Sequence, residues 1–263
     1  MSGAIPVGAI GILGWARIAM RLAAMMALLL ACVPLYYLWK PFPAPNPWPR
    51  RFLGAIARIA GARVRHRGLP MRQGALLIAN HVSWIDVPAL AGATGCAFVA
   101  HDGLASVPLL RWLCAMNDTV FVARHDRRSV AAQVAQVRAA LDDTGALAIF
   151  PEGTTSDGTG VLAFKSSLLS AFDPPPGGIS VQPVVLDYGS EAAAIAWVGT
   201  EHGLANFMRI LGRHRPVILD VRFLEPLAGD ALAGRKAMAA AASAAIAGAL
   251  AASRPMPAPA QPG

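Results

Sequence analysis

The sequence has little charge and little cysteine for its length. Asp, Glu, Lys and Arg make up 14% of its 263 residues, whereas soluble domains carry about 25%. With 55% hydrophobic residues, the chain is not a disordered segment, a fibrous repeat or a solvated scaffold. Its three cysteines, Cys32, Cys96 and Cys114, are too few and too scattered for a disulfide framework or a zinc site. We expect them to be small buried side chains in a reducing compartment.

Acidic residues are also scarce relative to basic ones. The 15 Asp and Glu residues stand against 23 Lys and Arg, which gives a net charge of +8. An apolar chain with a positive charge favours an anionic membrane surface or anionic substrates as partners. Nucleic acid is not expected, because the basic residues form no helical stripe and no nucleic-acid motif is present.

A long apolar run lies near the N-terminus. Residues 22–39 contain no charged side chain and as a helix would measure about 27 Å, close to the roughly 30 Å hydrocarbon core of a bilayer. Aromatic residues and then Lys40 end the run, as at a membrane interface. The run either spans the membrane once or pairs with the apolar residues 3–16 in a hairpin that enters one leaflet. A cleaved signal peptide fits poorly, since the charged part comes late and no A-x-A site follows.

The basic residues around this run predict the side of the membrane. Two arginines precede the run, and Lys40, Arg50, Arg51 and Arg58 follow it within about 20 residues. The body should therefore lie on the cytoplasmic face of the inner (plasma) membrane. We divide the chain into a membrane anchor at 1–40, a stiff proline-rich spacer at 41–49, a folded domain at 50–252 and a disordered tail at 253–263.

Short apolar runs bounded by turn residues alternate with helical patterns in this domain. The predicted strands are 75–79, 97–100, 120–123, 146–150, 181–186, 194–198 and 217–223. The predicted helices are 87–91, 107–116, 129–141, 164–172 and 232–252. The alternation favours an α/β fold with a mostly parallel central sheet flanked by helices. Sites in such sheets gather at the carboxyl ends of strands, and three polar clusters of this chain follow strands directly.

The first cluster, Asn80-His81-Val82-Ser83-Trp84-Ile85-Asp86, comes directly after the strand at 75–79. We place His81 in the turn before a helix that begins near Ser83, with Asp86 in the first turn of that helix. There Asp86 can accept the Nδ1 proton of His81 and leave Nε2 free to act as a general base. Ser83 and Asp86 alternatively fit an N-cap and its partner three residues later, with no catalytic role.

The other two clusters follow the strands at 146–150 and 120–123. Glu152, Gly153 and Thr154 offer a carboxylate, a close backbone approach and a hydroxyl, although the same residues also suit an ordinary turn. No Gly-Lys-Ser/Thr follows, so this turn is not a nucleotide-binding P-loop. Arg124 can hold a phosphate bidentately, or it is a solvated loop charge.

In their order and spacing the clusters resemble the glycerolipid acyltransferase family, specifically its 1-acylglycerol-3-phosphate acyltransferases. The matching blocks are N-H-x4-D at Asn80, His81 and Asp86, a strand with Phe121 that ends at Arg124, F-P-E-G-T at 150–154, and V-x-P-V at 181–184. The resemblance covers about residues 70–190. It implies that His81 is the catalytic base and Asp86 its partner. It also implies that the acceptor's glycerol phosphate is bound by Arg124, Glu152, Gly153 and Thr154.

Departures from the family pattern affect the acceptor headgroup. His101, Thr155 and Ser167 stand where lysine, arginine and glycine are common in the family. The expected acceptor is 1-acylglycerol-3-phosphate, whose acylation gives phosphatidic acid, and the alternative is lyso-ornithine lipid or another lysolipid. The expected donor is an acyl thioester of coenzyme A or of acyl carrier protein. Neither a metal ion nor a further cofactor is expected.

The residue types indicate how the reaction proceeds. A thioester is already electrophilic, so no covalent Ser or Cys is required, and the chain has no G-x-S-x-G motif. We expect His81 to take the proton of the acceptor hydroxyl while Asp86 supports the imidazolium and backbone N–H groups hold the oxyanion. A non-catalytic membrane lipid-binding protein is the competing interpretation, and the intact His81 and Asp86 disfavour it. A nucleotide-binding α/β protein is disfavoured by the lack of a glycine-rich phosphate motif.

Overall fold

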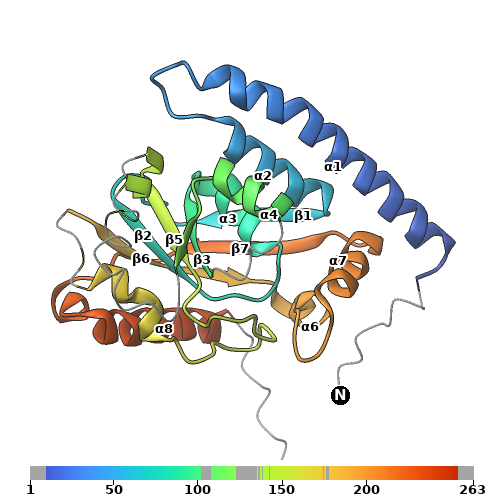
Figure 1. Ribbon diagram of the computed structural model, residues 1–263. Coiled ribbons are helices and arrows are strands. Elements are labelled where there is room, and N and C mark those ends of the chain that lie inside the picture. Colours follow the sequence, from blue (N-terminus) through green and yellow to red (C-terminus); the bar gives the residue numbers. More distant parts are fainter. Residues whose placement is uncertain are drawn as a thin grey trace, which may run out of the picture.

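The computed structural model describes residues 10–101, 108–122, 135, 137, 139–141, 143–173, 175 and 178–253. In this part of the chain the centre is one sheet of β1 (Ala62–Arg67), β2 (Ala75–Ala79), β3 (Ala97–His101), β4 (Val120–Val122), β5 (Ala146–Ile149), β6 (Ser180–Asp187) and β7 (Val217–Phe223). The strand order is β1-β7-β6-β2-β5-β3-β4. The strands from β6 to β4 run parallel, whereas β7 is antiparallel to β6 and pairs in parallel with β1. The predicted mostly parallel sheet is confirmed (Figure 1).

Helices cover both faces of this sheet (Figure 1). One face carries α2 (Trp48–Ile59), α3 (Asp86–Thr94) and α4 (Pro108–Met116), and the other carries α8 (Arg235–Ala252) and the 3-10 helix η4 (Ser166–Phe172). Alternation along β2 sorts its side chains between the two cores. Leu77 packs in the core that includes α2 and α3, and its neighbours Leu76 and Ile78 pack in the core that includes α8. Every residue of β2 is buried, so the segment that follows it starts from a rigid support.

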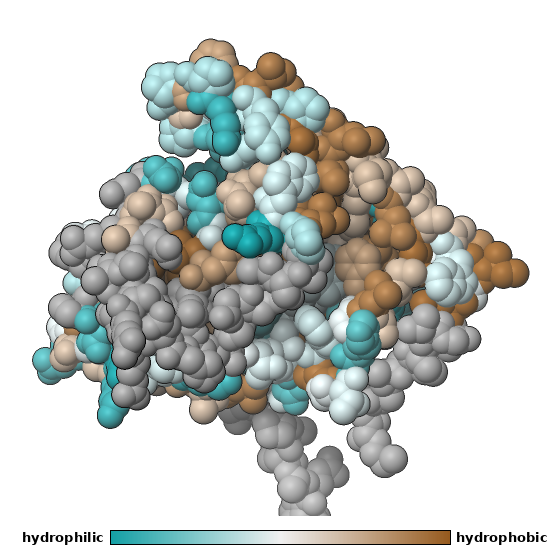
Figure 2. All heavy atoms as spheres, in the orientation of Figure 1, coloured by the Kyte–Doolittle hydropathy of each residue, from teal (hydrophilic) through white to brown (hydrophobic). Residues whose placement is uncertain are grey.

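The apolar N-terminal run lies within a single helix, α1 (Ile12–Trp39). This helix continues through Arg17 and Arg21, so residues 12–39 do not form the alternative hairpin. It is long and apolar enough to cross a membrane. It lies along the body, over α2 and against α7 (Gly203–Gly212), as Figure 1 shows. Its outer side is apolar, and Figure 2 shows brown residues along it. Large apolar side chains of α1 that are exposed include Ile12, Leu13, Met20, Met26 and Leu30.

The two arginines inside α1 attach it to the body. Arg21 Nη1 donates to the carbonyl oxygens of Leu211 at 2.8 Å and Ile210 at 3.3 Å, and Arg17 Nη1 donates to that of Gly212 at 3.4 Å. These carbonyls belong to the last turn of α7, where a helix has no partners of its own for them. Positive charge is also favourable at this end of the helix dipole. The charges that interrupt the apolar sequence therefore join α1 to the domain.

The structure corrects two expectations about connecting segments. Residues 194–198 are not a strand, because α6 (Ala192–Ile195) is helical and Arg209 takes the carbonyls of Ala194 and Ala196 that a strand would use for pairing. The proline-rich residues 41–47 form a turn and not an extended spacer. Trp39 and Asn46 side chains close this turn by donating to the carbonyls of Ala44 and Tyr36, so α2 folds back against α1.

Other local expectations also differ from the structure. Residues 166–172 form the 3-10 helix η4 where an α-helix was expected, and short 3-10 turns occur at η5 (Gly189–Glu191) and η6 (Gly229–Leu232). β1 was not predicted, because its sequence ARVRHR has no apolar run and its pairing with β7 decides its conformation. Most of the predicted helix at 129–141, and the tail from 254 onward, lie outside the described residues.

We predict that Arg21→Ala loosens α1 from the body. The change removes charged hydrogen bonds to the end of α7, which are worth about 2 kcal/mol, and should lower the apparent Tm of the detergent-solubilised protein by roughly 4–8 °C. Arg58→Ala is the control, because Arg58 is exposed and its side chain makes no hydrogen bond in the described structure. Equal Tm values for the two variants in thermal unfolding followed by circular dichroism would contradict the link.

Candidate active site

His81 and Asp86 occupy the turn between β2 and α3. His81 Nδ1 lies 2.8 Å from Asp86 Oδ2, which is the contact expected from the sequence. The expected helix start near Ser83 is wrong, because α3 begins at Asp86. The backbone N–H groups of Val82 and Ser83 donate to Asp86 Oδ2 at 2.6 and 2.9 Å, so the backbone bends around this carboxylate. Ser83 does not serve as an N-cap, since its buried Oγ has no hydrogen-bond partner among the described residues.

Asp86 is fully buried and is held through both of its oxygens. Oδ2 receives the three contacts above, and Oδ1 accepts a hydrogen bond from Tyr188 Oη at 2.5 Å. A buried carboxylate is tolerated where donors surround it in this way. The carboxylate can therefore fix the His81 tautomer with the proton on Nδ1, which leaves Nε2 as the acceptor for a substrate proton.

An aromatic wall and a partly open edge complete the surroundings of the His81 ring. The ring stacks on Phe150, with centroids 4.3 Å apart and planes inclined by 19°, and Phe150 stacks in turn on Phe98. The His81 side chain is 19% exposed. Nε2 has no hydrogen bond to any residue in the described part of the chain. The ring is thus oriented by Asp86 and Phe150 while its second nitrogen is left for a ligand.

The segment after β5 is bound to the same turn. Ser156 donates to the carbonyl of His81 through its backbone N–H at 2.7 Å and its Oγ at 3.1 Å. The backbone N–H of Trp197 donates to the carbonyl of Val82 at 3.0 Å, and Thr155 Oγ1 donates to the carbonyl of Trp197. Segments that follow β2, β5 and β6 therefore meet at one edge of the sheet, as the parallel topology predicts.

Glu152 lies in the turn that follows β5, and its side chain is buried. It is 1% exposed, and neither carboxyl oxygen has a hydrogen-bond partner of normal geometry among the described residues. The pKa of Glu152 is raised from 4.5 to about 8, mainly by burial and to a smaller extent by Asp86, against the opposing effects of nearby backbone N–H groups and Ser156. The neutral form is therefore favoured at pH 7. A direct role of Glu152 in acceptor binding stays a prediction.

The remaining predicted ligands are only partly placed. Gly153 adopts a φ of +65°, which favours glycine, and a Cβ there would lie 3.1 Å from Lys165 Nζ. Thr154 is exposed on the turn. Arg124 lies outside the described residues, just beyond the end of β4. Their roles toward the acceptor stay predictions as well.

Sequence reasoning missed several residues that support the site. Tyr188 and Trp197 contact the turn at 80–86, yet neither was given a role from the sequence. The signal for Tyr188 was its position directly after a strand that neighbours β2. Asn80 was matched to the first block without a role, and its side chain binds both backbone groups of Leu186 on β6, at 2.9 and 2.8 Å.

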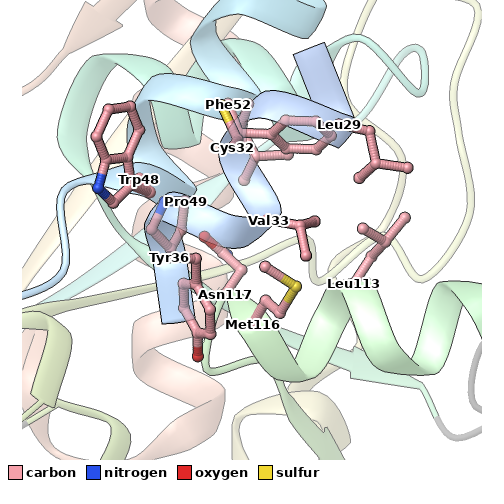
Figure 3. Close-up of a pocket in the computed structure, with 11 residues that line it drawn as sticks. Leu29, Cys32, Val33, Tyr36, Trp48, Pro49, Phe52, Leu113, Met116 and Asn117 are labelled. Atoms are coloured by element: carbon pink, nitrogen blue, oxygen red, sulfur yellow. The ribbon is translucent and has the colours of Figure 1, made fainter. Parts of the chain in front are cut away.

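An apolar pocket lies apart from the turn at 80–86. It has an empty volume of about 360 Å³, part of it open to solvent. Figure 3 shows that α1, α2 and the segment from α4 to Asn117 enclose it; the labelled lining includes Leu29, Cys32, Phe52, Leu113 and Met116. No residue of the turns at 80–86 or 150–156 lines it. Its surface suits an alkyl group better than a charged headgroup.

Known proteins are similar in sequence to this chain over most of its length. The Acyltransferase family model matches residues 62–187. The lyso-ornithine lipid O-acyltransferase of Brucella abortus is 32% identical over 250 residues, which cover 86% of this chain and 91% of that protein. The chain belongs to the glycerolipid acyltransferase family.

Other similar proteins differ in how much of this acyltransferase they match. The lyso-ornithine lipid O-acyltransferase of Rhizobium meliloti is 33% identical, over 85% of this chain and 82% of that protein. The 1-acyl-sn-glycerol-3-phosphate acyltransferase of Neisseria gonorrhoeae is 34% identical over 52% of this chain and 54% of that protein. The crystal structure of the 1-acyl-sn-glycerophosphate acyltransferase of Thermotoga maritima matches with a TM-score of 0.64 and 18% identity, over 91% of this chain and 97% of that one. That structural likeness shows the shared fold.

We predict that Glu152→Gln makes the stability of this acyltransferase less sensitive to pH. The raised pKa means that the unfolded chain loses the Glu152 proton before the folded protein does, so the native protein loses stability as pH rises from 4.5 to about 8. Glutamine removes this contribution. The Tm of the variant, measured from pH 5 to pH 8, should fall less than that of the wild type, and parallel curves would contradict the assignment.

Proposed function

We propose that this lysolipid acyltransferase transfers an acyl chain from an acyl thioester to the free hydroxyl of lyso-ornithine lipid, with His81 as the base. The contact that supports the mechanism is His81 Nδ1 at 2.8 Å from the buried carboxylate of Asp86. Because this contact occupies Nδ1, the second ring nitrogen is the one available to the acceptor. The arrangement has the geometry of a general base with its orienting carboxylate.

The proposed reaction has two proton transfers, one to His81 and one from it, so His81 ends in its starting state. His81 Nε2 takes the proton of the acceptor hydroxyl as its oxygen bonds to the thioester carbonyl carbon, and Asp86 stabilises the resulting imidazolium. The tetrahedral intermediate then collapses, the carbon–sulfur bond breaks, and the imidazolium proton passes to the leaving thiolate. The donor is a thioester of coenzyme A or of acyl carrier protein. No metal ion or further cofactor is included in this proposal.

The choice of acceptor rests on the extent of similarity. Relatives named as lyso-ornithine lipid acyltransferases match over at least 82% of their own length in the Brucella and Rhizobium proteins, whereas the Neisseria gonorrhoeae relative named for 1-acyl-sn-glycerol-3-phosphate matches over 54%. The second candidate acceptor is 1-acylglycerol-3-phosphate, which the complete F-P-E-G-T block at 150–154 supports. An ornithine headgroup offers a carboxylate where glycerol phosphate offers a phosphate, and Arg124 can pair with either anion.

The exposed apolar side of α1 supports work at a membrane. Without a membrane, the large apolar side chains on this side of α1 are exposed to water. Contact with a bilayer would bury them. The cytoplasmic face of the inner membrane is the proposed side, because basic residues follow α1 and acyl thioesters are made in the cytoplasm. The acceptor then reaches the site from the bilayer and the donor from water.

We predict that His81→Ala abolishes most acyl transfer and leaves the fold intact. Loss of a general base costs about 10²–10⁴-fold in rate, and the side chain is partly exposed, so its removal leaves no large buried cavity. Thiol release from an acyl thioester measures the rate, and circular dichroism checks the fold. His66→Ala is the matched control, because His66 is an exposed residue of β1. Near-normal transfer by the His81 variant would overturn the assignment.

We predict that lyso-ornithine lipid is acylated faster than 1-acylglycerol-3-phosphate. Purified wild-type enzyme is given each acceptor in turn, with the same acyl chain on coenzyme A and on acyl carrier protein, and products are quantified by mass spectrometry. The Arg124→Gln variant should raise the KM for the preferred acceptor with little change in kcat, since it loses an anion contact made in both ground and transition states. A higher kcat/KM on the glycerol phosphate acceptor would replace the first candidate by the second.

A further inference from the structure

The second oxygen of Asp86 is held from a different strand of the sheet. Oδ1 accepts from Tyr188 Oη at 2.5 Å, and Tyr188 is 3% exposed. No other hydrogen bond to Oδ1 is present in the described structure. Burial, and then the nearby Asp86, raise the pKa of Tyr188 well above 10, so the phenol keeps its proton and acts as a donor. The carboxylate that orients His81 is thus itself oriented by a neutral phenol.

The position of this phenol relative to the catalytic turn is set by Asn80. Tyr188 directly follows β6, which pairs in parallel with β2. The Asn80 side chain extends this pairing past the end of β2, because it donates to the carbonyl of Leu186 and accepts from the N–H of Leu186. Leu186 lies two residues before Tyr188, and Asn80 directly precedes His81. The pairing of Asn80 with Leu186 therefore fixes the position of the Tyr188 hydroxyl relative to the turn at 80–86.

We propose that Tyr188 is a positioning residue of the acyl-transfer site, which holds Asp86 in the rotamer that presents Oδ2 to His81 Nδ1. The proposal rests on the proposed function for its kinetic readouts. The three donors on Oδ2 lie on the catalytic turn itself, whereas Tyr188 anchors the carboxylate to the sheet. Without this anchor Oδ1 is a buried acceptor with no described partner. Because an unpaired buried acceptor is costly, rotamers that offer Oδ1 a donor then compete with the one in which Oδ2 faces His81.

A purely structural role would give a different result from positioning. Phenylalanine keeps the ring that Tyr188 contributes to the buried core, so Tyr188→Phe removes the hydroxyl and leaves the packing. A residue that only filled the core would change stability, with kcat and KM kept. A residue that positions Asp86 changes kcat with little change in KM, since it acts on the transition state through His81.

The first experiment compares Tyr188→Phe with wild type on the lysolipid preferred in the acceptor panel. We expect kcat to fall about tenfold, as for loss of one buried hydrogen bond to a charged group, with KM changed by less than about twofold. Tyr37→Phe is the control, because its hydroxyl lies on the outer side of the molecule, where Trp112 is its hydrogen-bond partner among the described residues, and its loss should leave both constants unchanged. An unchanged kcat for Tyr188→Phe, or a rise in KM alone, overturns the proposal.

The second experiment tests whether Tyr188 acts through Asp86. In an Asp86→Ala background, whose residual turnover is followed by mass spectrometry, Tyr188→Phe should cost less than about twofold, because the group that it positions is gone. A further tenfold loss in that background would show an action independent of Asp86 and overturn the proposal. This double-mutant cycle separates coupling from a simple sum of two losses.

A readout that needs no turnover separates this proposal from the proposed function. The proton on His81 Nδ1 should give a low-field NMR signal in the wild type, assigned by its absence in His81→Ala, which is lost or broadened in Tyr188→Phe and kept in Tyr37→Phe. An unchanged signal in Tyr188→Phe overturns the positioning role. If the wild type acylates no lysolipid in the panel, the proposed function fails, and the NMR comparison still decides the role of Tyr188.

Discussion

The buried carboxylate of Asp86 is the group around which the turn at 80–86 is organised. Transfer of an ionised group out of water is costly unless donors replace its hydration, and the chain supplies them from two places. The backbone N–H groups of Val82 and Ser83 donate to Oδ2, and α3 begins only at Asp86. Tyr188, which follows β6, donates to Oδ1. His81 is oriented as one more donor to the same carboxylate. The orientation of the His81 ring is therefore a consequence of satisfying Asp86.

The parts of the fold that surround this turn restrict its movement. β2 is buried along its whole length, Asn80 continues its pairing with β6, and Ser156 holds the carbonyl of His81. The apolar helix is joined to the same region, because Trp84 in the turn packs in one cluster with Ile18 of α1 and with Phe207 of α7. Arg17 and Arg21 fasten α1 to the end of α7 next to this cluster. The apolar helix α1 and the turn at 80–86 are thus parts of one packed unit.

Much of this arrangement was predictable where the pattern in the sequence is local. The buried run 146–149 and the alternating pattern of 217–223 are both typical of sheet strands, and strand ends followed by polar residues indicated where a site would form. The pattern failed where side chains from elsewhere decide the backbone. The sequence of residues 194–198 is typical of a strand, but Arg209 binds the carbonyls of Ala194 and Ala196. The sequence of β1 is typical of a loop, but it pairs with β7. The apolar content of these two segments does not indicate either of these contacts.

The sequence by itself determined the family, the α/β architecture and the pairing of His81 with Asp86, because ordered blocks and short-range spacing carry that information. Only the tertiary structure decided that Asp86 has a second support, since Tyr188 is 102 residues away from it in the chain. It also decided that Glu152 is enclosed in its turn, and that α1 lies along the domain with its arginines on α7. These outcomes depend on which donor meets which acceptor after the sheet has formed. Such distant encounters are determined by packing and not by neighbouring residues.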